Sequence, residues 1–535
     1  MKSLTDWLVE QKNSNHCLKI IFRNSDPLIM VGIFLTSMAI SVAVAIVILF
    51  NAADYGFFDV PIAAWVVLSL IGLHLFVEGL TFSLWRRLRR AEKSLTETRQ
   101  EVAARSAPRL STGEIPLVDG FRHLNRPEFL VLVQTLFKAP PAVRSVQLSP
   151  LPGGHSGSAT LLAKLQYKES GLLLPHTFVV KLGARAEILS EDQKFHRYVL
   201  GRLGRAARFL RHVRLEETAG IAYEFAGLGL GDSVQSFAQL YHDLPANHAA
   251  ALIEEIFAPL EQAWYRQGQV EPVDPRHEYH LLFKKQQLIL EQAERLLDQD
   301  DPYHQRLHLS KSQTDPQGRP NFCPDETIPW RDPVDFLQRQ PISTNPMPLH
   351  RSTIHGDLNA RNILFEVGQT GEPLLPWFID FSHTGNGLSA ARTAEAAREN
   401  IPVEADRGHT LRDFCRLEAD VKFILTTLEN DSDLEKAILF ERELMLGSME
   451  LPGPLPPAAL AEAQFDKAWR VIKSIRRRAA PYLADPADLR PYYWGLLHAT
   501  LPVVYYDPGQ FAGKSNERQQ KRYALMAAGM LCSRL

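Results

Sequence analysis

The sequence predicts an α+β protein in which two apolar spans precede a small β-rich lobe and a larger helical lobe. Three observations predict this order. Apolar runs occupy residues 28–50 and 62–85. Short alternating or β-branched runs, broken by glycine-containing turns, fill residues 143–225 and are typical of strands. From residue 236 onward, the spacing of apolar residues becomes mostly helical.

The two apolar runs predict a transmembrane hairpin, because each is long enough to cross a hydrocarbon core about 30 Å thick at about 1.5 Å per helical residue. Lysine and arginine flank both runs but are absent from the connecting residues 51–61. The positive-inside rule therefore places residues 1–27 and everything after residue 85 in the cytoplasm, with a short periplasmic loop between the spans. His74 and Glu78 interrupt the second run on one helical face. Such a pair is a functional candidate. The simpler explanation is that the two side chains hydrogen-bond each other or the first helix, or lie near the membrane interface.

Changes in composition set the remaining boundaries. Residues 122–137 predict a short amphipathic helix, and residues 187–203 predict a helix between the third and fourth strand runs. A strand pair is expected around Ile363 and Phe378, and the Pro- and Asp-rich region 298–348 is interpreted as a long loop or insertion. The resulting domains are a charged helical linker at 86–108, a β-rich lobe at 109–226 and a helical lobe at 227–535.

Composition argues against several function classes. The net charge of -2 indicates no dense basic face, so we expect no nucleic-acid partner. The cysteines lie far apart and form no CxxC pair, which favours reduced thiols over a disulfide framework or a zinc site. The segment GQFAGKS at 509–515 resembles a phosphate-binding loop, but it has too few residues between its glycines and follows a Pro-containing turn. We interpret it as a surface loop.

The strongest chemical signal is the pair of segments STIHGDLNARNILFE and LPWFIDFSHTGNG. They place Asp357 in a loop, Asn362 five residues later and Asp380 at the end of the next strand. This set suits phosphoryl transfer. An aspartate can accept the proton of an attacking hydroxyl, while an asparagine and a second aspartate hold Mg²⁺ against nucleotide phosphates. Asp, Asn and Gly are also common in ordinary turns, but turn preference does not explain the spacing or the flanking strands.

HGDLNARNIL and FIDFSHT together resemble the aminoglycoside phosphotransferase and choline kinase-like superfamily, whose members are relatives of the protein kinases. The resemblance implies a two-lobed protein-kinase-like fold. It also implies that Asp357 is the catalytic base, that Asn362 and Asp380 are metal ligands, and that His355 supports the loop. DFS replaces the DFG of protein kinases and no APE-like segment follows, which argues against a regulated activation segment.

The upstream half of the chain fits the same fold. LPGGHSGSATLL is a glycine-rich turn between two strands, and such a turn brings backbone N–H groups close to phosphate. The candidate residues of the turn are Gly153, Gly154, Ser156 and Gly157. In FVVKL, Lys181 ends an apolar strand and takes the place of the lysine that binds nucleotide phosphates.

A glutamate on the helix after this strand is the expected partner of Lys181. Glu187 and Glu191 are both available, and Glu191 is favoured because it lies beside the predicted buried face of the helix. That face consists of Ile188, Phe195 and Tyr198. GIAYEFAG is the expected hinge strand, with Tyr223 and Phe225 beside the adenine.

A closer resemblance covers most of residues 151–535. It rests on GGHSGSATLL, VVKLG with ILSEDQKFHRYV, AYEFAGLG, the two catalytic segments, DFCRLEADVKF and RYALMAAG. Together these look like the bacterial ternary complex associated domain family, a kinase-like phosphotransferase module of multi-component systems. The resemblance implies a bacterial protein that uses ATP and Mg²⁺, and the predicted hairpin then places the chain in the inner (cytoplasmic) membrane.

The leading hypothesis is a membrane-anchored phosphotransferase that moves the γ-phosphoryl group of ATP to a hydroxyl of a small molecule or a partner protein. Residues 243–348 contain no pattern that identifies this acceptor. A second hypothesis is a nucleotide-binding pseudoenzyme that recruits partner proteins into a complex at the membrane. A third is a sensor that relays a signal from the hairpin through the linker. The short loop at 51–61 leaves little room for a sensor's ligand.

Overall fold

The computed structural model describes part of the chain. The described residues are 117–118, 127–138, 143–150, 159–167, 176–204, 206, 208–224, 233–280, 291, 293, 327–339, 346–368, 373–398, 404, 406–446, 449–451, 462–511 and 513–535. Both predicted membrane spans, the linker, the glycine-rich turn and Phe225 lie outside them. None of the helices within these ranges is long and apolar enough to cross a membrane.

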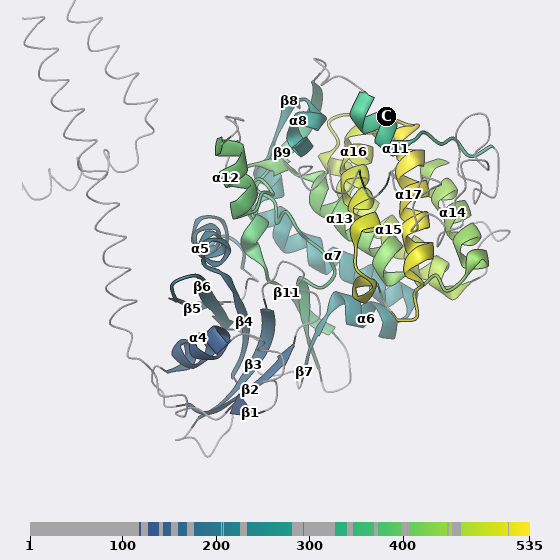
Figure 1. Ribbon diagram of the computed structural model, residues 1–535. Coiled ribbons are helices and arrows are strands. Elements are labelled where there is room, and N and C mark those ends of the chain that lie inside the picture. Colours follow the sequence, from purple (N-terminus) through teal and green to yellow (C-terminus); the bar gives the residue numbers. More distant parts are fainter. Residues whose placement is uncertain are drawn as a thin grey trace, which may run out of the picture. The chain divides into compact units, whose positions relative to one another are not determined.

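A six-stranded sheet, counted over the described residues, forms the first lobe in the order β1-β2-β3-β4-β6-β5 (Figure 1). Its strands are β1 Leu117–Val118, β2 Val143–Pro150, β3 Ala159–Tyr167, β4 His176–Ala184, β5 Arg208–Arg214 and β6 Thr218–Glu224. The β1–β2 pair is parallel and the other pairs are antiparallel. The four predicted strand runs are confirmed as β2, β3, β4 and β6. β1 and β5 were not predicted, and β5 is an arginine-rich edge strand whose polar side chains hide the usual alternation.

The alternation of side chains along β4 decides which face of the sheet carries chemistry. Phe178, Val180 and Leu182 pack into one apolar cluster with α4 (Pro127–Phe137), which confirms the described part of the predicted amphipathic helix. Val179 belongs to the other cluster, and Lys181 points to that same face. The face is covered by the helix that follows β4.

That helix is α5 (Arg185–Lys194), and it continues as a π-helical turn, η2 (Phe195–Val199). The predicted helix is therefore confirmed, but it begins two residues earlier and ends before residue 203. Its buried face is also confirmed, because Ile188, Phe195 and Tyr198 are all buried together with Glu191.

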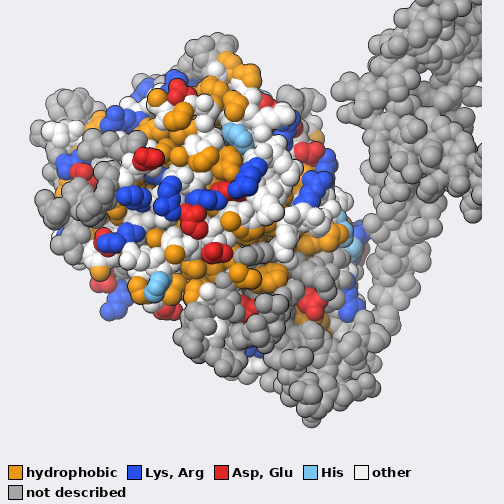
Figure 2. Space-filling view, turned by 180° about the vertical axis from the view of Figure 1, so that it is seen from behind, with side chains coloured by type: hydrophobic (Ala, Val, Ile, Leu, Met, Phe, Trp, Pro, Cys, Tyr) orange, Lys and Arg blue, Asp and Glu red, His pale blue; other side chains and the backbone are white. Residues whose placement is uncertain are grey.

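The second lobe is mainly helical, as expected (Figure 1). Its α-helices are α6 Phe237–Asp243, α7 Ala246–Ala263, α8 Pro275–His280, α11 Pro333–Arg339, α12 Ala390–Arg398, α13 Leu411–Asp420, α14 Asp431–Leu446, α15 Ala463–Ala479, α16 Arg490–Thr500 and α17 Glu517–Cys532. A π-helical turn, η7 (Val421–Leu425), continues α13, and the 3-10 turns are η3 Tyr265–Gln267, η6 Phe381–His383, η8 Ala480–Tyr482, η9 Leu501–Tyr505 and η10 Pro508–Gln510. On the face shown in Figure 2, basic, acidic and hydrophobic side chains are interspersed.

Two small sheets within this lobe flank the loop that carries Asp357. One has the order β11-β10-β7 and the other β12-β9-β8, over the residues described. Their strands are β7 Ser233–Ser236, β8 Gln269–Val273, β9 Met347–Ser352, β10 Ile363–Val367, β11 Pro373–Phe378 and β12 Gly408–His409. The predicted strand pair is confirmed, with Ile363 opposite Phe378. β8 and β9 were not predicted, because prolines stand opposite each other at Pro272 and Pro348 and break the usual strand pattern.

The interpretation of GQFAGKS as a loop is confirmed. The segment begins in the turn η10 and contains Gly513 with φ of +57°, so no strand leads into it. The charged residues that follow it form the start of α17, which is buried along most of its length.

Candidate active site

Lys181 is at the centre of the site where the two lobes meet. Its side chain is 8% exposed, and its Nζ lies 2.9 Å from Glu191 Oε2 and 2.5 Å from Asp380 Oδ1. Of the two glutamates considered for this contact, Glu187 instead accepts the backbone N–H of Ala391. Burial lowers the pKa of Lys181, but the two carboxylates outweigh it and raise the pKa above its usual value. The ammonium group is therefore charged at neutral pH.

Glu191 connects three parts of the site, although its side chain is fully buried. Its Oε1 accepts hydrogen bonds from the Tyr223 hydroxyl at 2.9 Å and from the backbone N–H of Phe381 at 3.2 Å. These donors, together with Lys181, satisfy a carboxylate that would otherwise be costly to bury. Glu191 thus ties β4, β6 and the segment after Asp380 together.

Tyr223 was expected beside the adenine, but the structure places its side chain in the core. The side chain is 1% exposed, and its ring lies 5.3 Å from that of Phe195 and 6.3 Å from that of Phe381. The strand period explains this, because Tyr223 is opposite Val179 in the β4–β6 pair and shares the face that α5 covers. Its hydroxyl supports Glu191.

Asp380 has an unusual backbone conformation. With φ of 63° and ψ of 70°, it is the only non-glycine among the described residues with positive φ, a conformation that costs energy and often occurs at functional sites. Its Oδ1 accepts a hydrogen bond from the Ser382 hydroxyl at 2.6 Å as well as from Lys181. Burial raises the pKa of Asp380, and Lys181 and Ser382 outweigh it, so that the pKa is lowered. Oδ2 accepts no hydrogen bond from the described residues.

The loop that carries Asp357 is held by one face of α13. Asp413 accepts the backbone N–H groups of His355 at 2.7 Å and Gly356 at 2.8 Å. Asp420, two turns later on the same helix, accepts the N–H of Ala360 at 2.8 Å. Both aspartates belong to the segment DFCRLEAD, whose residues were not predicted to take part in the site. Its polar residues recur at helical spacing, a signal that usually indicates a solvated face.

Both oxygens of the Asp357 carboxylate are engaged. Oδ1 accepts a hydrogen bond from Arg416 Nε at 3.0 Å, and Oδ2 accepts one from Asn359 Nδ2 at 3.1 Å. Burial raises the pKa of Asp357, but Arg416, His383 and His355 together outweigh it and the pKa is lowered, so the group is ionised at neutral pH. Arg416 also donates to the Tyr506 hydroxyl at 2.8 Å.

Asn362 and His355 join this loop to its surroundings. Asn362 Nδ2 donates to the backbone oxygen of Asp357 at 2.9 Å, which leaves Oδ1 as the atom able to bind a cation. The buried His355 places Nε2 3.0 Å from the backbone oxygen of Ile379, the residue before Asp380. His355 therefore connects the two catalytic segments.

The oxygens that accept no hydrogen bond from the part of the chain that the structure describes suit a magnesium ion. Asn362 Oδ1 and Asp380 Oδ2 are hard oxygen atoms of the kind that Mg²⁺ prefers. Among the described residues, no group of three or more His, Cys, Asp or Glu side chains could hold a metal by itself. A cation at these two residues would therefore take its other ligands from phosphate and water, as Mg²⁺ usually does in nucleotide sites.

The flanks of the glycine-rich turn are described, although the turn itself is not. β2 and β3 are paired as far as Pro150 opposite Leu161, and Thr160 stands opposite Lys181 in the β3–β4 pair. Strand pairing therefore places the start of β3, the strand that follows the predicted turn in the sequence, beside Lys181.

Comparison of the chain with known proteins gives a family match and a structural match. Residues 144–296 match the sequence profile of a family described as Ternary complex associated domain 9, in agreement with the resemblance seen in the motifs. A solved structure, a thermostable mutant of the aminoglycoside phosphotransferase APH(4)-Ia in its apo form, is similar with a TM-score of 0.32 and 13% identity, covering 72% of this chain and 94% of that chain. No curated protein matches the sequence. The β-sheet lobe, the helical lobe and the contacts of Lys181 fit a kinase-like fold.

Proposed function

We propose that this chain is a kinase-like phosphotransferase that moves the γ-phosphoryl group of ATP to a hydroxyl group of a small molecule or a partner protein. The observation that supports this most strongly is the simultaneous contact of Lys181 with Glu191 and Asp380. A lysine that served only the stability of the sheet would not need a strained aspartate from the other lobe. The two catalytic segments also meet through His355.

The residues have different tasks in this proposal. Lys181, held by Glu191, binds the nucleotide phosphates. Asp357 orients the acceptor hydroxyl and takes its proton, and its lowered pKa is compatible with a loose transition state that needs little basicity. Asn362 and Asp380 would hold Mg²⁺, which neutralises phosphate charge when bound.

The test is ATP turnover by the full-length chain in detergent with a broad panel of hydroxyl acceptors. Asp357→Ala and Asp380→Ala should both lower turnover at least about 100-fold, the usual size of a lost charge-positioning contact. Asp466→Ala is the control, because this partly exposed aspartate forms its one ion pair within the described residues with Arg470, on the surface of α15. Turnover by the parent that is no higher than that of the two site variants would overturn the enzyme assignment.

We also propose that residues 28–50 and 62–85 anchor the chain in a membrane, with the site on the cytoplasmic side. The flanking lysines and arginines support this orientation. In vesicles, Cys17 should react with a membrane-impermeant thiol reagent only when the cytoplasmic face is exposed, and Asp54→Cys only from the opposite face. Release of the chain from membranes by alkaline carbonate would contradict the anchor.

A second candidate is a nucleotide-binding scaffold that recruits partner proteins. The match to a profile named for a ternary complex favours it. Purification of the native complex with the parent and with Asp357→Ala separates the two functions. An unchanged partner set with unimpaired cellular function in the variant supports the scaffold, whereas loss of function with the partner set intact supports the enzyme.

A further inference from the structure

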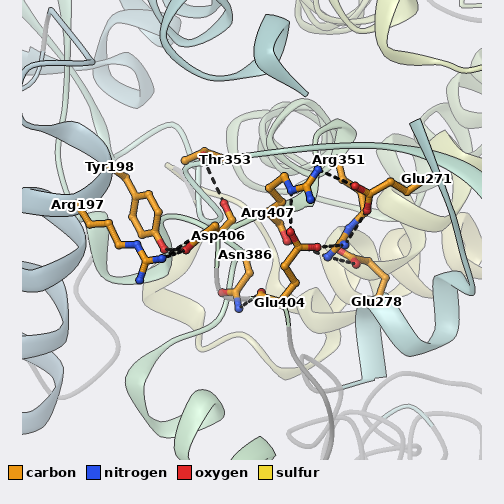
Figure 3. Close-up of polar contacts among 10 residues, drawn as sticks. All are labelled: Arg197, Tyr198, Glu271, Glu278, Arg351, Thr353, Asn386, Glu404, Asp406 and Arg407. Carbon is orange, nitrogen blue, oxygen red and sulfur yellow. Dashed lines mark hydrogen bonds and ion pairs between the residues drawn. The ribbon is translucent and has the colours of Figure 1, made fainter. Parts of the chain in front are cut away.

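We propose that Asp406 is a positioning residue for the Lys181–Glu191 pair, which it holds in place through η2 at the end of α5. The inference rests on the proposed nucleotide site. It concerns a segment between α12 and β12 to which the proposed mechanism assigns no role. Figure 3 shows the polar contacts that carry it, with Asp406 between the η2 residues Arg197 and Tyr198 and a second group of charged residues.

The segment around Asp406 is fixed to the helical lobe on both sides. Arg351 of β9 places Nη1 2.6 Å from Glu404 Oε2 and donates from Nη2 to the backbone oxygen of Arg407 at 2.8 Å. Arg407 in turn donates from Nε to Glu404 Oε1 at 2.7 Å. The hydroxyl of Thr353 donates to the backbone oxygen of Asp406 at 3.2 Å. The backbone of Asp406 therefore belongs to the helical lobe.

The carboxylate of Asp406 contacts the other lobe. Its Oδ1 accepts the Tyr198 hydroxyl at 2.5 Å, and Arg197 Nη2 lies 2.6 Å from the same oxygen. Arg197 and Asp406 have side chains that are 58% and 46% exposed, and an exposed ion pair alone contributes little. Tyr198 is only 4% exposed, and its backbone oxygen accepts Trp264 Nε1 at 2.9 Å. The tyrosine is therefore the partner through which Asp406 acts.

Tyr198 lies on the same face of the helix as Glu191. The two are seven residues apart, which is somewhat less than two turns because η2 is π-helical, and both side chains are buried. A shift of η2 is transmitted along α5 to the contact between Glu191 and Lys181, which an ångström of displacement would break. Lys194 provides a second attachment, because its Nζ donates to the backbone oxygen of Ser382 at 2.7 Å. Loss of Asp406 should therefore make α5 more mobile, while Lys194 still holds the helix against the helical lobe.

The experiment uses the full-length chain with Asp406→Ala, Tyr198→Phe and the double variant. Hydrogen exchange of the amides of residues 185–199 is measured without nucleotide, and Mg-ATP affinity is measured by titration. Each single variant should speed exchange in this helix and weaken Mg-ATP binding by up to about tenfold, the equivalent of one hydrogen bond to a charged group. The double variant should be no worse than Asp406→Ala, because both changes remove the same contact.

Asp466→Ala is the matched control, because this side chain is 38% exposed and also forms a surface ion pair. It should leave both measurements unchanged. Additive effects of Asp406→Ala and Tyr198→Phe, or exchange rates in 185–199 equal to those of the parent, would overturn the inference. A parent chain that does not bind Mg-ATP would instead overturn the proposed function, while the exchange rates would still decide the role of Asp406.

Discussion

Replacing Lys181 with methionine removes the cation that two carboxylates share in the site. Taking away one partner of a buried ion pair costs about 3–5 kcal/mol of unfolding free energy, because it leaves an uncompensated buried charge. Glu191 keeps two donors, the Tyr223 hydroxyl and the Phe381 N–H, and each contributes roughly 0.5–1.5 kcal/mol. Asp380 is partly exposed and regains hydration. We therefore expect a loss of about 3 kcal/mol, at the lower end of that range.

Urea unfolding of the full-length chain in detergent, followed by tryptophan fluorescence, measures this loss. The double variant Lys181→Met with Glu191→Gln should recover roughly half of it, because no unpaired carboxylate then stays buried. Lys436→Met is the control, since this lysine forms a single ion pair with Glu462 near the surface. It should leave the urea midpoint nearly unchanged.

Two results would refute the reasoning. One is an effect of Lys181→Met no larger than that of Lys436→Met. The other is strict additivity of the Lys181 and Glu191 substitutions, since residues in one ion pair should not act independently. Either result would mean that the lysine and the glutamate do not depend on each other in the folded chain.

Three further predictions concern other parts of the helical lobe. Lys422 is fully buried, and its Nζ lies 2.9 Å from Glu441 Oε1. Lys422→Met should therefore lower the unfolding free energy by about 3–5 kcal/mol. A loss below about 1 kcal/mol, measured by urea unfolding, would contradict this. Burial lowers the pKa of His409 to about 3, so between pH 7 and pH 5 the unfolded chain takes up a proton that the folded chain does not. Stability should fall by about 2 kcal/mol over that interval on account of this residue, and His409→Gln should abolish that share in unfolding measured at both pH values. Gly356 has φ of +85°, and a Cβ there would lie 2.5 Å from the backbone oxygen of His383. Gly356→Ala should therefore displace the loop that carries Asp357 and lower ATP turnover about 100-fold. Unchanged turnover would show that this loop accommodates the added methyl group.

Much of the site could be predicted from the sequence, because its main residues stand at the ends of strands or within one loop. Lys181 follows an apolar run, and Asp357 and Asn362 share a short motif whose spacing is itself informative. The choice of Glu191 over Glu187 also followed from local reasoning about the buried face of a helix. Strand ends, motif spacing and the buried face of a helix all depend on residues close together in the chain, so they can be read from the sequence.

The supports of the site could not be predicted in the same way. Asp413 and Asp420 lie on a charged helix that would ordinarily face water, and only the packing of α13 against the loop turns them inward. Tyr223 was expected beside the adenine, because the sequence does not show that α5 covers this part of the sheet and that Glu191 accepts the hydroxyl. Asp406 is more than 200 residues from its partners in η2.

The sequence alone determined the order of the two lobes, the strand that carries Lys181 and the loop that carries Asp357. Each of these depends on local periodicity and on turn chemistry, which nearby residues decide. Only the tertiary structure decided how the charges are paired, because ion pairs such as Lys181 with Asp380 join residues distant in the chain. Burial then makes these partners necessary, since a charge taken out of water must find a compensating group wherever the fold supplies one.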